Sequence, residues 1–226
     1  MPNSGSALAR DRAYAFAKGC ILDGTFPSGS LVSEGDVAAT VGVSRTPVRE
    51  AFLRLEVEGF VRLYPKRGAV VVPVSLEEIR AVLEARELIE VHALQKLAAS
   101  SAGDRACLAE ELRTLSVDQD EAIGRNDDTA FALADRAFHE RLVAATGNQI
   151  LGGYYVALRD RQVRMNLTAF RRDPERTRRN RADHHRILDA LVAGDAAELA
   201  TQIRGHIHAI GDLLDVRPGH GRNGQG

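Results

Sequence analysis

The stretch GVSRTPVREA, residues 42–51, decides the architecture of the first third of this chain. Ser44 stands where a serine commonly caps a helix, and Pro47 is tolerated in the first turn, because an N–H there would have no partner inside the helix. An apolar face follows at helical spacing: Val48, Phe52 and Leu55. Gly59 suits the position just after a helix. The sequence therefore predicts a helix that starts beside Ser44 and ends before Gly59.

The flanking sequence predicts two more helices and a hairpin. Apolar spacing indicates a helix over about residues 7–23 and a shorter one over 33–39. Residues 60–64 and 69–72, rich in valine, predict two short strands. A helix–turn–helix followed by such a hairpin is a winged helix–turn–helix, which is the fold we expect for residues 1–74.

Two arginines stand at the start of the central helix. Arg45 and Arg49 are four residues apart and share one face, and an arginine in this place can bind guanine O6 and N7 in the major groove of DNA. Ser44, Thr46 and the free N–H groups of the first turn can bind phosphate. The alternative is a solvated arginine-rich face with surface pairs such as Arg49–Glu50.

The predicted turn of the hairpin is also basic. Lys66 and Arg67, followed by Gly68, form its tip, and these cations can enter the minor groove beside the helix. Residues 44–67 carry six basic and three acidic side chains, whereas the whole chain has a formal net charge of −1. The positive charge is local, so it indicates a DNA contact only together with the predicted geometry.

The overall composition is that of an ordinary globular protein. Of the 226 residues, 44% are hydrophobic and 27% are charged, which argues against disorder as the main state. The two cysteines cannot form a disulfide scaffold and fit a reducing compartment. We find no signal-peptide pattern and no apolar run of membrane-span length, so we expect a cytoplasmic protein without a membrane partner.

From residue 75 onward, every pattern is helical. Ser75 and Glu78 form a capping box that predicts a helix of about 25 residues. Five turn signals separate five further helices: Gly103-Asp104, Asn126-Asp127, Gly147-Asn148, Asp173-Pro174 and Gly194-Asp195. We expect an all-α helical bundle over residues 75–216. The glycine-rich residues 217–226 are predicted to be a disordered tail, and their GxGxxG spacing has no strand or helix beside it to make a dinucleotide site.

The helix expected over about residues 127–146 places two metal-ligating side chains near its buried face. Its apolar stripe consists of Phe131, Phe138 and Leu142. Around the helix axis, Asp135 lies about 40° and His139 about 80° from Phe131. A buried carboxylate is costly unless it is paired or binds a cation. On this helix alone, a hydrogen bond between Asp135 and His139 is the alternative.

Two later helices add histidines with the same orientation. His184 and His206 fall in the apolar stripes of their helices, whereas their neighbours His185 and His208 fall outside them. Three histidines and Asp135 on core faces indicate a site for a divalent metal ion. This ligand set suits Zn²⁺, and it also accepts Ni²⁺, Fe²⁺ or Mn²⁺.

Residues 42–51, followed by the sequence LEVEG at residues 55–59, resemble the signature of GntR-type bacterial transcription regulators. The resemblance covers about residues 10–73. It implies a dimeric repressor or activator that inserts the central helix into a short palindromic operator in double-stranded DNA. Gly35 stands where some relatives have an arginine that helps to contact DNA. Either that contact is missing, or Arg45 and Arg49 carry more of the recognition.

Residues 76–216 resemble the all-helical effector domain (FCD) of the FadR subgroup, through DxxFHxxL at 135–142, DHxxIxxAL at 183–191 and RxH at 204–206. In the metal-binding branch of that subgroup, the resemblance assigns four ligands: Asp135, His139, His184 and His206. Asp183 stands where relatives usually have glutamate, outside the ligand set. Members of this branch sense small organic acids, which implies a small carboxylate effector that reaches the metal.

Arg86 is the candidate second anchor for such a carboxylate, because a guanidinium can bind it through two hydrogen bonds. Arg86 shares an apolar stripe with Glu90, four residues on. A buried Arg86–Glu90 ion pair is the alternative, and the spacing favours it somewhat. For the arginine-rich segment 171–181, a solvated loop and helix face is predicted.

Three functions fit these features. The first is a ligand-responsive, DNA-binding transcription regulator, which we predict, with no catalytic residues. The second is a metal-dependent hydrolase whose His₃-Asp site activates water. An enzyme does not need a winged helix, and Glu140, the acid nearest in sequence to His139, lies about 100° from it around the helix. In the third, the metal has a purely structural role.

Overall fold

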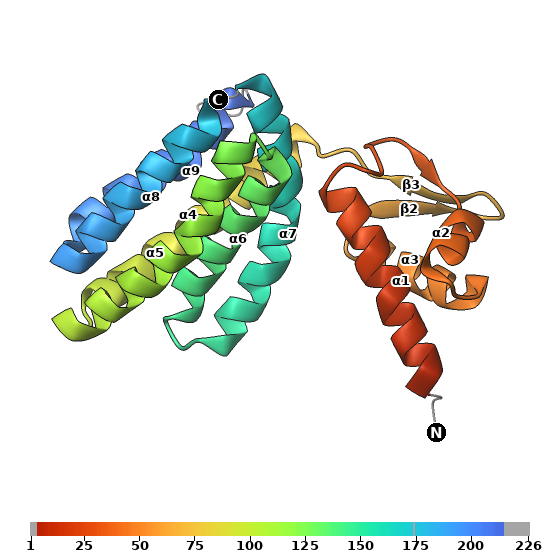
Figure 1. Ribbon diagram of the computed structural model, residues 1–226, viewed down its shortest axis with the longest axis horizontal. Helices are drawn as coiled ribbons and strands as arrows, with labels where there is room; N and C mark the ends of the chain where they lie inside the picture. The colour runs from red at the N-terminus through yellow and green to blue at the C-terminus, as the bar shows by residue number, and fades with distance from the viewer. Residues whose placement is uncertain (1–3, 174, 215–226) are drawn as a thin grey trace, which may run out of the picture. The chain divides into compact units, whose positions relative to one another are not determined.

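The computed structural model describes residues 4–173 and 175–214. The chain divides between Val74 and Ser75 into two compact units (Figure 1). Among the described residues, no helix is both long enough and apolar enough to cross a membrane. Residues 217–226, predicted as a disordered tail, lie outside the described part of the chain.

Residues 4–74 form a winged helix–turn–helix, as predicted. The elements are, in order, α1 (Ser4–Leu22), β1 (Leu31–Val32), α2 (Glu34–Val41), α3 (Arg45–Val57), β2 (Val61–Tyr64) and β3 (Gly68–Val71). The strands form one antiparallel sheet in the order β1-β3-β2. Helix α1 packs on α3, and the predicted apolar face of α3 is buried. The prediction missed β1, which is only two residues long.

The turn between α2 and α3 is set by local capping. Ser33 Oγ accepts a hydrogen bond from the Gly35 N–H at 3.1 Å, which caps α2. Gly42 ends α2 with a left-handed φ of 70°. Ser44 takes the N-cap position of α3, but its hydroxyl makes no capping hydrogen bond. Helix α3 therefore begins where the sequence predicts, and the Ser44 side chain stays available to another partner.

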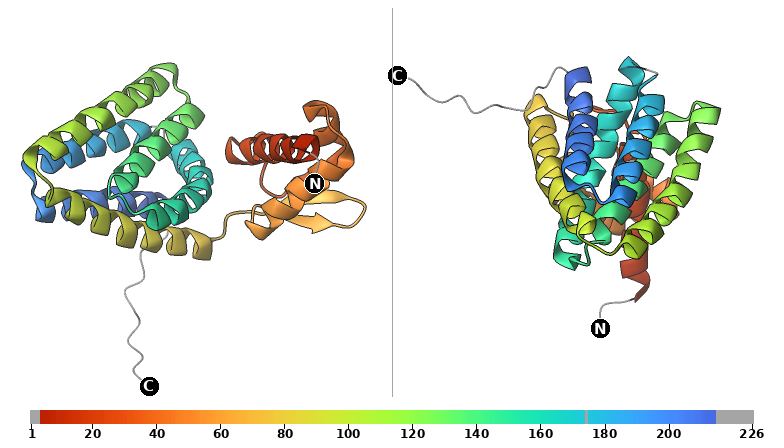
Figure 2. Two further views of the ribbon diagram at one scale, coloured as in Figure 1. Left: turned by 90° about the horizontal axis from the view of Figure 1, so that it is seen from below. Right: turned by 90° about the vertical axis from the view of Figure 1, so that its left-hand side faces the viewer.

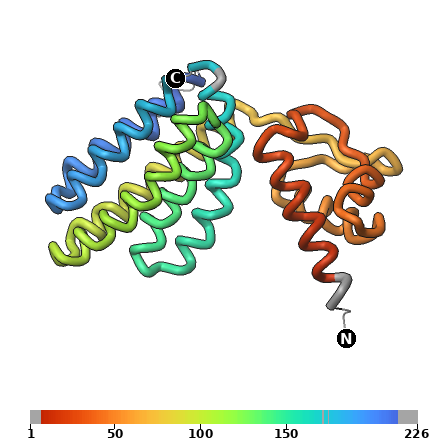
Figure 3. The backbone as a smooth tube through the Cα atoms, viewed as in Figure 1, coloured from red at the N-terminus to blue at the C-terminus, as the bar shows by residue number. Residues whose placement is uncertain are grey.

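The C-terminal unit is an all-α bundle, as predicted. Its described helices are α4 (Leu76–Ala98), α5 (Ala102–Arg125), α6 (Asp128–Ala144), α7 (Gln149–Arg172), α8 (Arg176–Ala193) and α9 (Ala196–Leu213). Helix α4 packs against α9, and α5 packs against both α6 and α8 (Figures 2 and 3). Helices far apart in the sequence thereby turn their inner faces toward one interior.

Two helix starts in this bundle differ in detail from the prediction. Ser75 Oγ accepts a hydrogen bond from the Glu78 N–H at 3.0 Å. The Glu78 carboxylate does not complete the capping box, because it pairs with Arg161 of α7 at 2.7 Å. Helix α5 begins just after Ser101, not at residues 103–104, because the Ser101 hydroxyl caps its first turn.

Gly68 is essential to the wing, which gives a stability test. Its φ is +119°, and a Cβ there would lie 2.3 Å from the backbone oxygen of Val32 in β1. Gly68→Ala should therefore lower the free energy of unfolding of the N-terminal unit by about 2 kcal/mol. As a control, Gly19→Ala in α1 meets nothing within 4 Å and should be neutral or stabilising by up to about 1 kcal/mol. Urea unfolding followed by circular dichroism measures both, and equal midpoints for Gly68→Ala and wild type would contradict the expectation.

Candidate functional site

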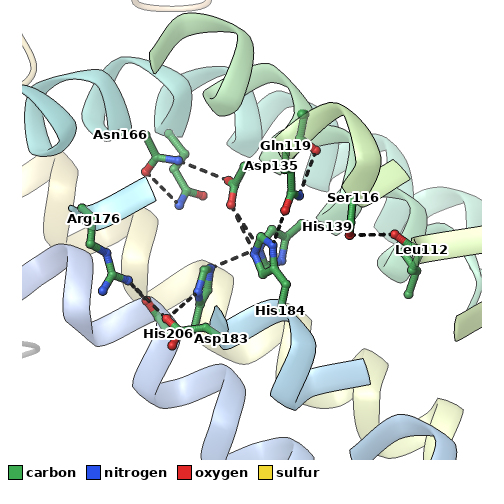
Figure 4. A network of polar contacts seen from close by, with 12 residues as sticks. Leu112, Ser116, Gln119, Asp135, His139, Asn166, Arg176, Asp183, His184 and His206 are labelled. Carbon is green, nitrogen blue, oxygen red and sulfur yellow. Dashed lines mark hydrogen bonds and ion pairs between the residues drawn. The ribbon is translucent and has the colours of Figure 1, made fainter. Parts of the chain in front are cut away.

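Four side chains from three helices meet inside the C-terminal bundle: Asp135 and His139 of α6, His184 of α8 and His206 of α9 (Figure 4). Each is at most 2% exposed. His139 Nε2 lies 3.2 Å from Nε2 of both other histidines, and Asp135 Oδ1 lies 3.4 Å from His184 Nε2. All four ligand atoms lie within 4.8 Å of one another. The structure brings together the four residues that helical spacing selected.

The neighbouring histidines are turned away, as the helical phase predicts. His185 follows His184 directly but is exposed. His208, two residues after His206, lies 2.8 Å from the carboxylate of Glu87 on α4. The four buried residues are thus selected by the packing of their helices, not by a local abundance of histidine.

Each buried imidazole has an oxygen beside its Nδ1 atom. The pairs are His139 with Glu90 Oε2 at 2.8 Å, His184 with Gln119 Oε1 at 2.9 Å, and His206 with Asp183 Oδ2 at 3.2 Å. For His184 and His206, an acceptor in this place holds the proton on Nδ1 and leaves the lone pair of Nε2 pointing into the cluster. Nδ1 of His139 makes no hydrogen bond among the described residues, although Glu90 lies beside it. We assign the tautomers from these partners. The sequence prediction missed the role of Glu90, Gln119 and Asp183, which depends on contacts between helices.

The charge states of the cluster follow from burial and from one arginine. Burial lowers the pKa of His139 to about 3 and that of His206 to about 4. Burial alone would raise the pKa of Asp135, but Arg159 of α7, helped by His184, holds it well below its usual range. At neutral pH the imidazoles of His139 and His206 are therefore neutral, and the carboxylate of Asp135 is ionised.

The donor set fits a divalent metal ion. Asp135 Oδ1 is buried and has no hydrogen-bond partner, whereas its Oδ2 accepts hydrogen bonds from Arg159 and Asn166. When each imidazole carries its proton on Nδ1, the Nε2 atoms of His139, His184 and His206 face one another as acceptors, and no N–H or O–H of the described residues donates to them. A cation among these atoms would satisfy all of them at once, and three imidazoles with one carboxylate are ligands that Zn²⁺ and neighbouring metals prefer.

Further polar side chains are buried around the cluster. Their shared feature is an atom without a hydrogen-bond partner among the described residues: Arg86 Nη1, Arg159 Nε, Arg176 Nε, and both side-chain amide atoms of Asn180. Buried polar groups in native proteins are almost always paired. Four of these five atoms are N–H donors, and Asn180 Oδ1 is an acceptor, so together they can bind a polar ligand or water.

Arg86 and Glu90 form the ion pair that the sequence left as an alternative. Arg86 donates from Nε to Glu90 Oε1 at 2.5 Å and from Nη2 to Oε2 at 3.3 Å. Tyr155 of α7 also donates its hydroxyl to Glu90 Oε1, at 2.6 Å. Both Arg86 and Glu90 are completely buried. Only Nη1 of Arg86 remains free for a further acceptor.

The prediction for the segment 171–181 was wrong at three residues, because Arg176, Thr177 and Asn180 are buried. Arg178 and Arg179 are exposed, as a solvated face requires. Arg176, however, is 4% exposed, and its Nη2 donates to the backbone oxygen of His206 at 3.3 Å. Arg176 belongs to the face of α8 that also carries His184, and the irregular charge pattern of the segment concealed this.

Glu140 of α6 was the acid considered as a general base for a hydrolase. Its carboxylate pairs with Arg136 at 2.6 Å.

The N-terminal unit carries a second candidate site, a groove of about 500 Å³ between α2, α3 and the wing. Arg45, Arg49, Lys66 and Arg67 line it, together with Gly68. These four cations are exposed, and within the described part of the chain none makes a side-chain hydrogen bond or ion pair; the Arg49–Glu50 pair is not formed. Ser44 and Thr46 are exposed at the adjoining first turn of α3.

Comparison with known proteins agrees with both units. Residues 10–71 match the family model "Bacterial regulatory proteins, gntR family", and residues 81–209 match the "FCD domain" model. A transcriptional regulator from Streptomyces ambofaciens, described as HTH-type, is 31% identical over 95% of this chain and 89% of that protein. The gluconate operon transcriptional repressor of Bacillus subtilis is 32% identical over 55% of this chain and 50% of that protein.

Among solved structures, E. coli McbR/YncC has a TM-score of 0.77 and 21% identity, over 92% of this chain and 97% of that one. At this identity, the likeness shows the fold. The matching families and relatives are transcription regulators, not enzymes. The chain therefore belongs to the GntR family of DNA-binding bacterial transcription regulators and carries an FCD domain as its C-terminal unit.

Proposed function

We propose that this regulator responds to a small organic acid, which binds at a divalent metal ion in the FCD domain and changes the affinity for operator DNA. The observation that carries the proposal is the buried centre of Asp135, His139, His184 and His206, with an unpaired carboxylate oxygen and unpaired guanidinium atoms around it. One relative is named after an operon for gluconate, which is itself a small carboxylate.

On the DNA side, the first turn of α3 lies in the major groove. Arg45 and Arg49 bind guanine edges, while Ser44 and Thr46 bind phosphates. Lys66 and Arg67, held by the turn at Gly68, reach the minor groove. The four unpaired cations of the groove support this arrangement, because elsewhere in the chain many arginines are already ion-paired. A homodimer places two such units on a palindromic operator.

On the effector side, the four ligands hold Zn²⁺, or Ni²⁺, Fe²⁺ or Mn²⁺ in its place. When bound, the metal supplies a Lewis-acidic position for one carboxylate oxygen. Nη1 of Arg86 is the protein donor we assign to the same carboxylate. The effector changes operator affinity because it binds the DNA-competent and the free conformations differently. Helix α4 is the proposed connection, since it carries Arg86 and begins at Leu76, shortly after β3.

The recognition helix is tested by single substitutions. Arg45→Ala or Arg49→Ala should reduce discrimination between the operator and its base-pair variants by about 1–3 kcal/mol, the value of a guanine contact. Lys66→Ala should weaken binding with less effect on sequence discrimination, because the minor groove presents nearly the same acceptor pattern for both orientations of an A·T pair. Fluorescence anisotropy on operator variants measures both effects. Equal, sequence-independent losses from all three changes would remove the assignment of α3.

The metal centre is tested by elemental analysis of the purified protein. We expect about one divalent ion per chain, in line with one cluster of four protein ligands. His139→Ala, His184→Ala and His206→Ala should lose it, whereas the matched controls His185→Ala and His208→Ala should keep it, because these side chains point away. Metal retained without His184 but lost without His185 would refute the site.

The effector response is tested by titrating operator complexes with small mono-, di- and tricarboxylates. A true effector should change operator affinity by roughly 5- to 150-fold, the usual range of allosteric coupling. Chelation of the metal should abolish the response. Arg86→Lys should weaken it, because lysine keeps a cation beside Glu90 but lacks the guanidinium fork. A response that survives both changes would place the effector elsewhere and leave the metal a structural role.

A further inference from the structure

The guanidinium of Arg45 lies against Gly35, in the first turn of α2. A Cβ atom on Gly35 would lie 3.2 Å from Arg45 Nη2, 3.7 Å from Arg45 Cζ and 3.4 Å from Ser33 Oγ. Arg45 therefore occupies the space that a side chain at position 35 would fill. The two residues belong to different helices of the helix–turn–helix, so their contact relates the recognition helix α3 to α2.

Within the described part of the chain, no hydrogen bond or ion pair fixes Arg45. Its side chain is exposed. The N-terminus of a helix repels a cation, but Glu34 and Asp36 on either side of Gly35 bring negative charge to this turn. The acidic turn thus tolerates the guanidinium, and the missing side chain of Gly35 gives it room.

We propose that Gly35 is a specificity-determining position, which sets where the guanidinium of Arg45 lies and hence which base pair it recognises. This rests on the proposed insertion of α3 into the major groove. Two-point hydrogen bonding to guanine needs the planar guanidinium in one orientation, so a displacement at its tip weakens discrimination more than it weakens phosphate contacts. Position 35 acts without touching DNA itself.

The displacement of the Arg45 guanidinium should increase with the size of the residue at position 35. With Gly35→Ala, the new methyl group requires Nη2 to move by a few tenths of an ångström, because 3.2 Å is closer than ordinary contact. With Gly35→Leu, the side chain fills the space and the guanidinium must leave it. Alanine and leucine both favour a helix over glycine, and Arg45 is a flexible neighbour, so neither substitution should lower the thermal unfolding temperature.

The test uses the full chain and DNA sites selected by the wild type from a random library. Dissociation constants are then measured for the selected site and all its single base-pair variants. Gly35→Leu should lose preference at the same base pairs as Arg45→Ala, by about 5- to 150-fold, and Gly35→Ala should lose less in the same direction. In the Arg45→Ala background, Gly35→Leu should have no further effect. The matched control Gly19→Ala, where a methyl group meets nothing within 4 Å, should bind like wild type.

Three results would overturn the inference: wild-type preferences in Gly35→Leu, changes at base pairs that Arg45→Ala leaves unaffected, or losses that add in the double variant. These results would leave the proposed DNA-binding mode standing. If Arg45→Ala keeps every wild-type preference, the assigned role of Arg45 in base recognition fails, and the inference about Gly35 fails with it.

Discussion

The meeting of three imidazoles and one carboxylate at a single buried point constrains the whole C-terminal bundle. Helices α6, α8 and α9 must each hold one rotation about their axes, because a turn of one residue would replace His184 by the exposed His185. The Nδ1 acceptors add α4 and α5 to the same arrangement, through Glu90 and Gln119. One set of polar contacts thus fixes the rotation of five helices about their axes. An apolar core would not fix it as strictly, because its side chains can be exchanged and repacked.

The buried arginines follow from the same constraint. An ionised Asp135 in the interior is costly without a compensating cation. Arg159 provides that cation, and its other contact, with Gln162 one turn further along α7, keeps it in place. The core of this bundle is mainly apolar, but around the cluster it holds buried polar groups, several of them paired and a few with unpaired atoms.

Local sequence signals predicted the elements well. The serine caps at Ser33 and Ser75 and the glycine at Gly42 each act within one turn of backbone, so the boundaries of α2 and α4 follow from a few residues. The three clustered histidines could be predicted to be buried too, since helical phase distinguishes an inward from an outward residue. A two-residue strand such as β1 carries no period of its own, and its pairing with β3 depends on tertiary structure.

The parts that could not be predicted involve partners on other helices. Gln119 lies 65 positions before His184, and Arg176 looks like its solvated neighbours until α9 is packed against it. The sequence also gives the Arg86–Glu90 spacing, but it does not show that Glu90 reaches His139 as well. In each case the spacing within one helix identifies the inward face, and only the packing identifies what that face meets.

Glu90 accepts from Arg86 and Tyr155 and also lies against the Nδ1 of His139, so one carboxylate serves three helices. This sharing has a consequence for how the family can diverge. Replacement of Glu90 would leave the guanidinium of Arg86, the phenol of Tyr155 and the imidazole of His139 without this carboxylate, all of them buried. A substitution at one of these positions alone is therefore destabilising. Substitutions at the four positions should therefore appear in related chains as a block, and a relative that has replaced its His139 equivalent should have exchanged the other three as well.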